Sequence, residues 1–213
     1  MLALPPSDDE NIEIQRVVNA CRPNREAYAT QSAKYARQMV SIAQSMKCPI
    51  DSILNLGCRT GEIAAVFESL LPGVRQIGVD IVEEFIDEAI ESNFPGEFLV
   101  ADFCSIPLEN NSVDWIICDE SLEHCLDVPR AISEACRVAK YGLFYIVPLE
   151  PDTPEFRAAN LSHHYFEPDP LKWLNLFLPH PEWSFYLACR SSGGWYLTFC
   201  FLKGHQPMRK VTS

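Results

Sequence analysis

A glycine-containing turn near residue 57 is the first feature of the sequence that indicates chemistry. The stretch Ile53-Leu-Asn-Leu-Gly-Cys-Arg-Thr-Gly-Glu-Ile63 starts as an apolar run, turns at Gly57 and begins a helical pattern at about Thr60. Glycine at such a turn lets the backbone bend sharply and approach a ligand closely. In doubly wound sheets, ligands bind outside the carboxyl ends of the strands. The turn therefore predicts a ligand site at that edge of a sheet.

Two acids follow the next two predicted strands. Asp80 lies 23 residues after Gly57, where a carboxylate can accept both ribose hydroxyls of a nucleoside. Asp102 comes directly after the third strand, where it can meet an adenine amino group. A dinucleotide-binding turn would have a glycine at the position of Arg59, which disfavours an NAD-dependent oxidoreductase. Asn55 and the two acids suit a nucleoside ligand with a positively charged centre better than they suit a negatively charged diphosphate ligand.

A second group of titratable residues follows the fourth predicted strand. His124 is the candidate general base for an acceptor, because its ordinary pKa is near neutral, although it could instead only cap or orient the loop. The spacing Glu120-x-x-Glu123-His124 would place three side chains on one face of a helical turn. With His164 further along the chain, they are candidate ligands of a divalent cation, which would lower the pKa of an attacking hydroxyl.

The elements that would position these residues alternate along the chain. Amphipathic helical patterns over 63–71, 83–92 and 128–139 separate short strands that are apolar throughout. Those strands are expected at 53–56, 76–79, 98–101, 113–118 and 143–147. Short apolar strands separated by amphipathic helices predict βαβ units and a parallel sheet that is covered on both faces.

The two ends of the chain differ from this alternation. Residues 25–47 carry an apolar stripe at helical spacing, and we expect the helices of residues 1–51 to form a lid over the site. At the other end, a helix over 170–178 precedes two strands, 183–189 and 195–202, which read as an antiparallel hairpin. Residues 52–213 are expected to form the main α/β unit, and the whole chain is expected to be a single globular domain.

On these motifs the chain resembles the class I S-adenosylmethionine-dependent methyltransferases, in particular the broad type 11-like group that acts on small molecules. The resemblance implies an α/β fold with a doubly wound, seven-stranded, mostly parallel sheet and a C-terminal antiparallel hairpin, the Rossmann-like methyltransferase fold. The residues that it implies for cofactor binding are Asn55, Gly57, Cys58, Gly61, Asp80, Ile81, Asp102, Phe103 and Asp119. Glu134, Arg137 and Gly142 match the phrase that the family carries before its fifth strand.

The resemblance also implies a reaction. It is methyl transfer from S-adenosylmethionine to a small-molecule acceptor, more often at oxygen than elsewhere, with His124 and Glu123 as catalytic residues. The family usually has Asp or Glu where Asn55 stands and Gly where Arg59 stands. These departures keep open a cofactor-binding but catalytically idle partner or regulatory domain. A third reading is a metal-dependent 2′-O-methyltransferase of RNA ends, whose metal phrase the segment around Glu123 and His164 resembles.

Composition limits the partners and the compartment. The formal net charge of −12 disfavours a nucleic-acid partner, because binding a phosphate backbone requires clustered Lys and Arg. Nine scattered cysteines without a C-x-x-C pair are expected to be core thiols in a reducing cytoplasm. No apolar run is long enough to span a membrane, and the acidic N-terminus does not resemble a signal peptide. The oligomeric state is not indicated.

Overall fold

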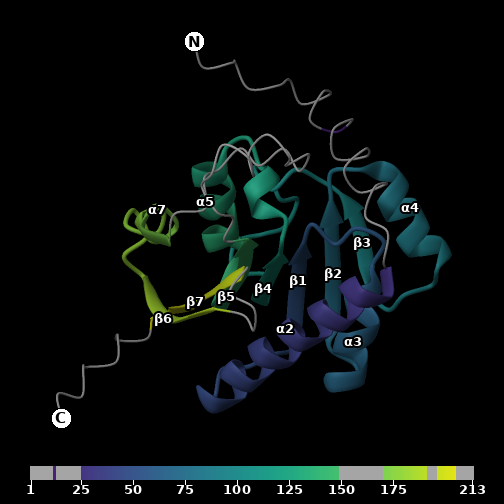
Figure 1. The fold of residues 1–213 in the computed structure, drawn as a ribbon, viewed down its shortest axis with the longest axis horizontal. Coiled ribbons are helices and arrows are strands. Elements are labelled where there is room, and N and C mark those ends of the chain that lie inside the picture. The colour runs from purple at the N-terminus through teal and green to yellow at the C-terminus, as the bar shows by residue number, and fades with distance from the viewer. Residues whose placement is uncertain (1–11, 13–24, 149–169, 191–195, 205–213) are drawn as a thin grey trace.

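Seven strands form one sheet in the order β3-β2-β1-β4-β5-β7-β6 (Figure 1). The computed structural model describes residues 12, 25–148, 170–190 and 196–204. The strands are β1 Ser52–Leu56, β2 Arg75–Asp80, β3 Glu97–Val100, β4 Val113–Asp119, β5 Ala139–Pro148, β6 Trp183–Arg190 and β7 Tyr196–Lys203. Strands β1 to β5 pair in parallel, whereas β7 is antiparallel to both β5 and β6. The predicted mostly parallel, doubly wound sheet with a C-terminal hairpin is therefore confirmed.

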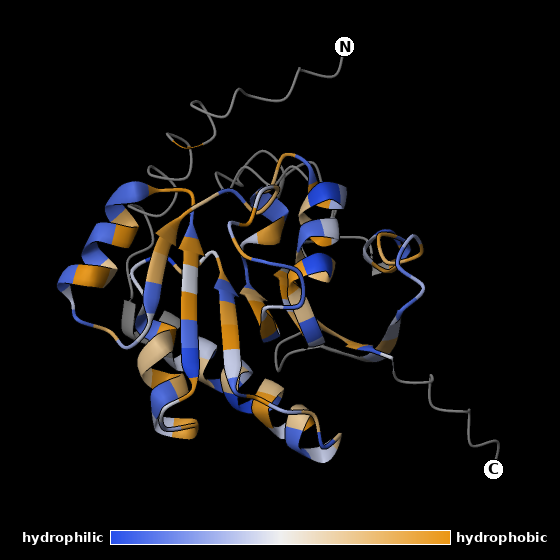
Figure 2. Cartoon of the chain, turned by 180° about the vertical axis from the view of Figure 1, so that it is seen from behind, coloured by the Kyte–Doolittle hydropathy of each residue, from blue (hydrophilic) through white to orange (hydrophobic). Residues whose placement is uncertain are grey.

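Helices cover both faces of this sheet. Their bounds are α2 Arg25–Ser45, α3 Glu62–Leu70, α4 Glu83–Glu91, α5 Val128–Val138 and α7 Pro170–Asn175. One buried cluster joins α2 and α3 to the sheet, and a second joins α5 and the segment around Trp173 to the opposite face. The distribution of hydrophobic residues explains why helices cover the sheet. Figure 2 shows hydrophobic residues in the strands, while α4 and α5 carry hydrophilic residues on their outer faces. Every position of β1 and β4 is buried, which explains why apolar residues predominate in both strands.

Two of the element boundaries that differ from the sequence-based expectation have a clear physical reason. Helix α3 begins at Glu62 because Gly61, with a φ of 84°, holds a left-handed conformation that a helix cannot continue. Strand β5 begins at Ala139, four residues before the expected start, and therefore includes Gly142. A side chain at Gly142 would overlap the indole ring of Trp115 on β4, so this glycine is needed for packing within the sheet. It does not precede the strand, as the family phrase implied.

Helix α2 confirms the expected N-terminal helix. Its apolar stripe is buried in the same cluster as residues of β4 and β5, with Tyr35 2% exposed and Met39 fully buried. The apolar stripe of α2 therefore packs into the core. The role of residues 1–51 as a lid stays a prediction. Among the described residues, we find no helix that combines the length and the apolar character needed to cross a bilayer.

Candidate active site

The loops that follow β1 and β4 meet at the point where the strand order reverses. Strand β1 lies between β2 and β4, so the chain leaves β1 to one side and returns on the other. Gly57, directly after β1, has a φ of 75°, and a Cβ atom there would overlap Ser121 in the loop after β4. Only glycine satisfies both the left-handed backbone and this contact. In open α/β sheets, such a reversal is the usual ligand-binding position.

Replacing Gly57 with Ala should reduce the free energy of unfolding by about 2–5 kcal/mol, because a left-handed L-residue costs about 1–2 and a steric overlap about 1–3. Gly73→Ala is the matched control, since Gly73 has a similar φ of 79° but a Cβ atom there would meet nothing within 4 Å. Urea denaturation of both variants gives the comparison. Equal losses would show that Ser121 readily moves away from Gly57.

Asp80 lies at the end of β2 and is held by the backbone on both of its oxygens. Its Oδ2 accepts the N–H of Arg59 at 2.9 Å, and its Oδ1 accepts the N–H of Val82 at 3.0 Å. The residue is 7% exposed, and burial raises the pKa of its carboxyl above the ordinary value despite these hydrogen bonds. Each carboxylate oxygen can accept a second hydrogen bond. Asp80, with Ile81 directly after it, can therefore still accept from vicinal hydroxyls of a ligand.

Arg59 completes the connection between the glycine turn and Asp80. Its φ of 47° is left-handed, a conformation in which most side chains are disfavoured. This explains why the family usually has glycine at the position. The left-handed backbone directs the N–H of Arg59 at the Asp80 carboxylate. The positive charge of the Arg59 guanidinium lowers the pKa of Asp80, but burial raises that pKa by more.

Three other residues of the predicted cofactor turn lie beneath it. Asn55 and Cys58 line a small apolar hollow together with Gly61, between β1, β2 and α3. The thiol of Cys58 lies only 2.8 Å from where a Cβ atom would stand on Gly78, and burial raises the pKa of that thiol. A Cβ atom on Gly61 would lie 3.0 Å from the ring of Phe98. Cys58 can therefore offer a ligand only its backbone, and Gly61 is required by packing.

The loop after β3 brings Asp102 and Phe103 toward the same turn. The ring of Phe103 would be 3.3 Å from a Cβ atom on Gly57, so the ring borders the glycine turn. The Oδ1 atom of Asp102 accepts the N–H of Cys104 at 2.8 Å. One Asp102 oxygen thus stabilises its own turn, and a carboxylate can accept further hydrogen bonds.

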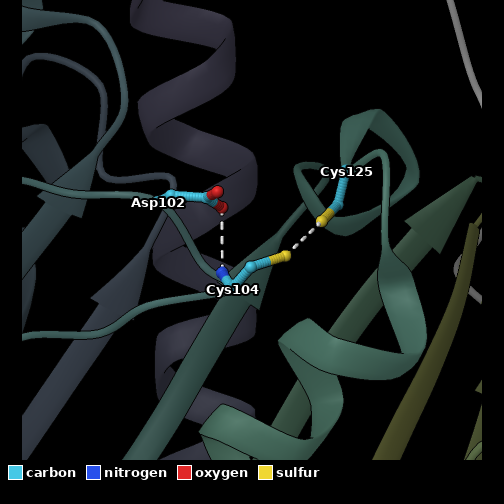
Figure 3. A group of neighbouring side chains, drawn as sticks. All are labelled: Asp102, Cys104 and Cys125. Atoms are coloured by element: carbon cyan, nitrogen blue, oxygen red, sulfur yellow. Dashed lines mark hydrogen bonds between the residues drawn. The ribbon is translucent and has the colours of Figure 1, made fainter. Parts of the chain in front are cut away.

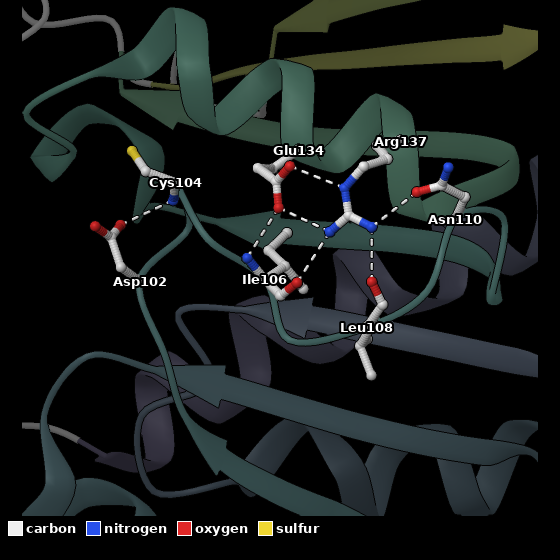
Figure 4. Close-up of polar contacts among 7 residues, drawn as sticks. All are labelled: Asp102, Cys104, Ile106, Leu108, Asn110, Glu134 and Arg137. Atoms are coloured by element: carbon white, nitrogen blue, oxygen red, sulfur yellow. Dashed lines mark hydrogen bonds and ion pairs between the residues drawn. The ribbon is translucent and has the colours of Figure 1, made fainter.

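An ion pair on α5 fixes this loop in place (Figure 4). The Arg137 guanidinium donates to both Glu134 oxygens at 2.8 Å, and it also donates to the carbonyls of Leu108 at 2.7 Å and Ile106 at 2.9 Å. The Glu134 Oε2 atom accepts the N–H of Ile106 at 3.0 Å in return. The hydrogen bonds from Arg137 lower the pKa of the Glu134 carboxyl. The matched family phrase is therefore an anchor that holds the loop of Asp102 and Phe103.

Replacing Arg137 with Ala should reduce the free energy of unfolding at neutral pH by about 3 kcal/mol, because hydrogen bonds to charged groups contribute about 1.5–3 kcal/mol each and are not additive. Because the folded pKa of Glu134 is lowered, its contribution is complete above the ordinary Glu pKa of about 4.3 and is lost as the pH falls through the lowered value. Denaturation at neutral and acidic pH should therefore show less acid sensitivity in Arg137→Ala. Arg130→Ala, an exposed change on the same helix whose charge has the smallest effect on the pKa of Glu134, is the control and should change acid sensitivity far less.

The segment after β4 carries the other candidate residues. The Ser32 hydroxyl of α2 donates to Asp119 Oδ2 at 2.6 Å, and Gln31 Nε2 donates to Glu120 Oε1 at 2.6 Å. Glu120 has a φ of 50°, and the short 3₁₀ helix η1, Leu122–His124, begins only after it. The prediction that Glu120 shares a helical face with Glu123 and His124 is therefore wrong, because Glu120 is itself left-handed and lies before the helical turn begins.

Glu123 and His124 are adjacent in sequence and both lie in the short helix η1. Both are buried, and the Nε2 atom of His124 lies 4.0 Å from Oε1 of Glu123. The fourth candidate metal ligand, His164, lies outside the described residues.

The contacts from α2 and Ser121 were missed in the sequence. Ser32 is a polar residue in an otherwise apolar helical stripe, and this pattern could have indicated a buried hydrogen bond. Ser121 gave no comparable signal, because its contact with Gly57 depends on how two distant loops meet.

The comparisons with known proteins agree with this arrangement. Residues 54–147 match a family model described as a methyltransferase domain. The chain is 31% identical over 145 residues to an uncharacterized 37.1 kDa protein in transposon TN4556 of Streptomyces fradiae, covering 64% of this chain and 42% of that protein. It is 25% identical over 139 residues to malonyl-[acyl-carrier protein] O-methyltransferase of Yersinia pestis, covering 65% of this chain and 51% of the enzyme. The chain thus spans about half the length, or less, of these relatives.

A solved structure supports the fold independently. The plantazolicin methyltransferase BpumL, in complex with SAH, superposes with a TM-score of 0.71 at 14% identity, covering 93% of this chain and 96% of that one. At that identity the similarity concerns the fold alone. The family match over residues 54–147 and this shared fold agree: the strands and loops that build the site are similar to a methyltransferase domain, and the chain has the Rossmann-like methyltransferase fold.

Proposed function

We propose that this protein transfers a methyl group from S-adenosylmethionine to an oxygen atom of a small-molecule acceptor. The observation that carries the proposal is the Asp80 carboxylate, which is fixed by two backbone N–H groups beside the left-handed Gly57 turn. That carboxylate keeps acceptor capacity for a ribose, at the sheet edge where nucleosides bind. The Yersinia pestis relative, an O-methyltransferase by name, supports oxygen as the acceptor atom.

The residues around the reversal point fit the parts of this cofactor. Asp80 would accept from the ribose, and Asp102 with Phe103 would hold the adenine beside Ile81. The backbone of the turn from Gly57 to Gly61, with Asn55 beneath it, and Asp119 would hold the amino-acid end. When bound, S-adenosylmethionine supplies a methyl group on a positively charged sulfur. The acidic side chains Asp80, Asp102 and Asp119 suit that positive charge.

His124 would act on the acceptor side. Methyl transfer to a hydroxyl releases a proton, and a neutral imidazole at the end of β4 can take it. Glu123, 4.0 Å away, would hold the ring and stabilise the charged imidazolium. The hydrogen bonds of Gln31 and Ser32 to the same loop support the proposed lid role of residues 1–51, because they tie the start of α2 to Glu120 and Asp119.

A cofactor-binding but idle domain is the second candidate. It is favoured by the left-handed Arg59, which places a charged side chain in a turn where the family usually has glycine. The metal-dependent RNA 2′-O-methyltransferase loses part of its support, since Glu120 is outside the turn of Glu123 and His124. The net charge of −12 also favours a small molecule over nucleic acid, and the free thiols among the described cysteines favour a cytoplasmic location.

Calorimetry followed by a transfer assay tests the proposal. Titration with S-adenosylmethionine and S-adenosylhomocysteine should give saturable binding of both. Labelled S-adenosylmethionine should then pass its methyl group to a member of a panel of hydroxyl and carboxyl acceptors. Binding without transfer to any acceptor would favour the idle domain, and absence of binding would reject both candidates.

A further inference from the structure

Two cysteines and an acid converge between the loop after β3 and the start of α5 (Figure 3). The Sγ atoms of Cys104 and Cys125 lie 3.7 Å apart, although 21 residues separate them in sequence. A carboxylate oxygen of Asp102 lies near both, so that the three potential ligand atoms are within 4.8 Å of one another. Both cysteines are more than nine-tenths buried. Among the described residues, this is the one such grouping of metal-ligating side chains.

The spacing of the two sulfurs matches a metal site. In a tetrahedral zinc site, two sulfurs that are each about 2.3 Å from the ion lie about 3.8 Å apart. The Sγ–Sγ distance of 3.7 Å is therefore already that of a pair of zinc ligands. In such a site a carboxylate oxygen lies about 3.6 Å from each sulfur, and the Asp102 oxygen lies within 4.8 Å of both, so it has to move by at most about 1 Å.

We propose that Asp102, Cys104 and Cys125 bind a thiophilic divalent cation of the zinc class, with water at the fourth position. This site shares Asp102 with the proposed adenine contact, but the argument for it does not rest on methyl transfer. Two thiolates and one carboxylate supply the charge and the soft ligands that such an ion prefers. The ion would link the loop of Phe103 to the segment of His124, because Cys104 and Cys125 are neighbours of those residues in sequence.

The protons must leave as the ion enters. The hydrogen bond with Cys125 and burial together raise the pKa of the Cys104 thiol, so this sulfur is protonated without metal. Binding replaces the S–H bond of each cysteine with an S–metal bond and releases the protons to solvent, with no change in oxidation state. A disulfide would instead need an external two-electron oxidant and closure of the sulfurs to about 2.05 Å.

Cadmium and zinc titrations of the reduced full-length protein test the proposal. Cadmium should produce an ultraviolet thiolate-to-metal charge-transfer band that saturates at a single equivalent, and it should displace zinc that was bound beforehand. Cys104→Ala and Cys125→Ala should each weaken binding by about 100-fold or more, as loss of a ligand costs at least as much as loss of an outer hydrogen-bond partner. Cys136→Ala, which removes a buried thiol of α5 outside the cluster, should bind normally.

A second measurement does not depend on the variants folding. In the wild-type protein, zinc should protect Cys104 and Cys125 together from alkylation, as read by mass spectrometry of peptides. Absence of the band, its persistence in both cysteine variants, or a Cys104–Cys125 disulfide formed in place of metal binding would overturn the proposal. None of these outcomes depends on affinity for S-adenosylmethionine, so the proposed function is tested separately.

Discussion

Replacing Asp80 with Ala should weaken the binding of S-adenosylmethionine by about 100-fold or more. Charge-assisted hydrogen bonds to the ribose would be lost, and these contribute about 1.5–3 kcal/mol each, with each 1.4 kcal/mol equal to a tenfold change in affinity. The substitution also removes the acceptors of the Arg59 and Val82 N–H groups. Calorimetry on the folded variant measures the affinity. Asp80→Asn keeps the shape of the side chain and one carbonyl acceptor, so it shows how much of the loss is due to the negative charge alone.

Asp114 provides a matched control at the opposite edge of the sheet. It is 3% exposed, and its Oδ2 accepts the N–H groups of Asp51 at 2.7 Å and Ser52 at 3.1 Å. Asp114→Asn removes a buried carboxylate of the same kind, so it should lower stability without changing affinity for the cofactor. If the two variants bound S-adenosylmethionine equally well, Asp80 would have only a structural role and the cofactor assignment would fail.

Replacing His124 with Gln should lower kcat by about 100-fold or more with a hydroxyl acceptor, because positioned proton transfer contributes about 10²–10⁴-fold. Binding of S-adenosylmethionine should be unchanged, since His124 acts on the acceptor. The acidic limb of the pH–rate profile should also disappear, because the imidazole must be neutral to accept a proton. His180→Gln, on a partly exposed histidine whose ring bonds Ser133 at 3.3 Å, is the control and should retain full activity.

The size of the His124 effect also distinguishes two classes of acceptor. A carboxylate acceptor is already ionised at neutral pH and needs no base, whereas a hydroxyl does. Loss of His124 should therefore matter far less for methyl ester formation than for methyl ether formation. An unchanged rate on a hydroxyl acceptor would exclude His124 as the base.

The alternation of elements was predictable because the central strands β1 and β4 are buried on both faces. Such strands read as continuous apolar runs, and β1 and β4 were found where these runs lie. The start of β5 was not predictable, since it depends on how Gly142 fits beneath the Trp115 ring of the neighbouring strand. Periodicity along the chain carries no information about such a contact between strands.

The candidate site divides in the same way. The position of Asp80 at the end of β2 was predicted from a fixed offset within one βαβ unit, and its contact with a ribose stays a prediction. Glu120 was assigned to the wrong geometry, because spacing alone does not reveal that its backbone is left-handed. Cys104 and Cys125 were interpreted as ordinary core thiols, since only the folding of two separate loops brings their sulfurs together.

The position of β7 has a consequence for how the chain folds during synthesis. Strand β5 pairs with β4 on one side and with β7, Tyr196–Lys203, on the other. Until the ribosome has released that last strand, β5 is an unpaired and strongly apolar border of a five-stranded sheet. Such borders promote association between nascent chains. Chaperone demand and aggregation should therefore be governed by the delay between translation of residue 148 and residue 203.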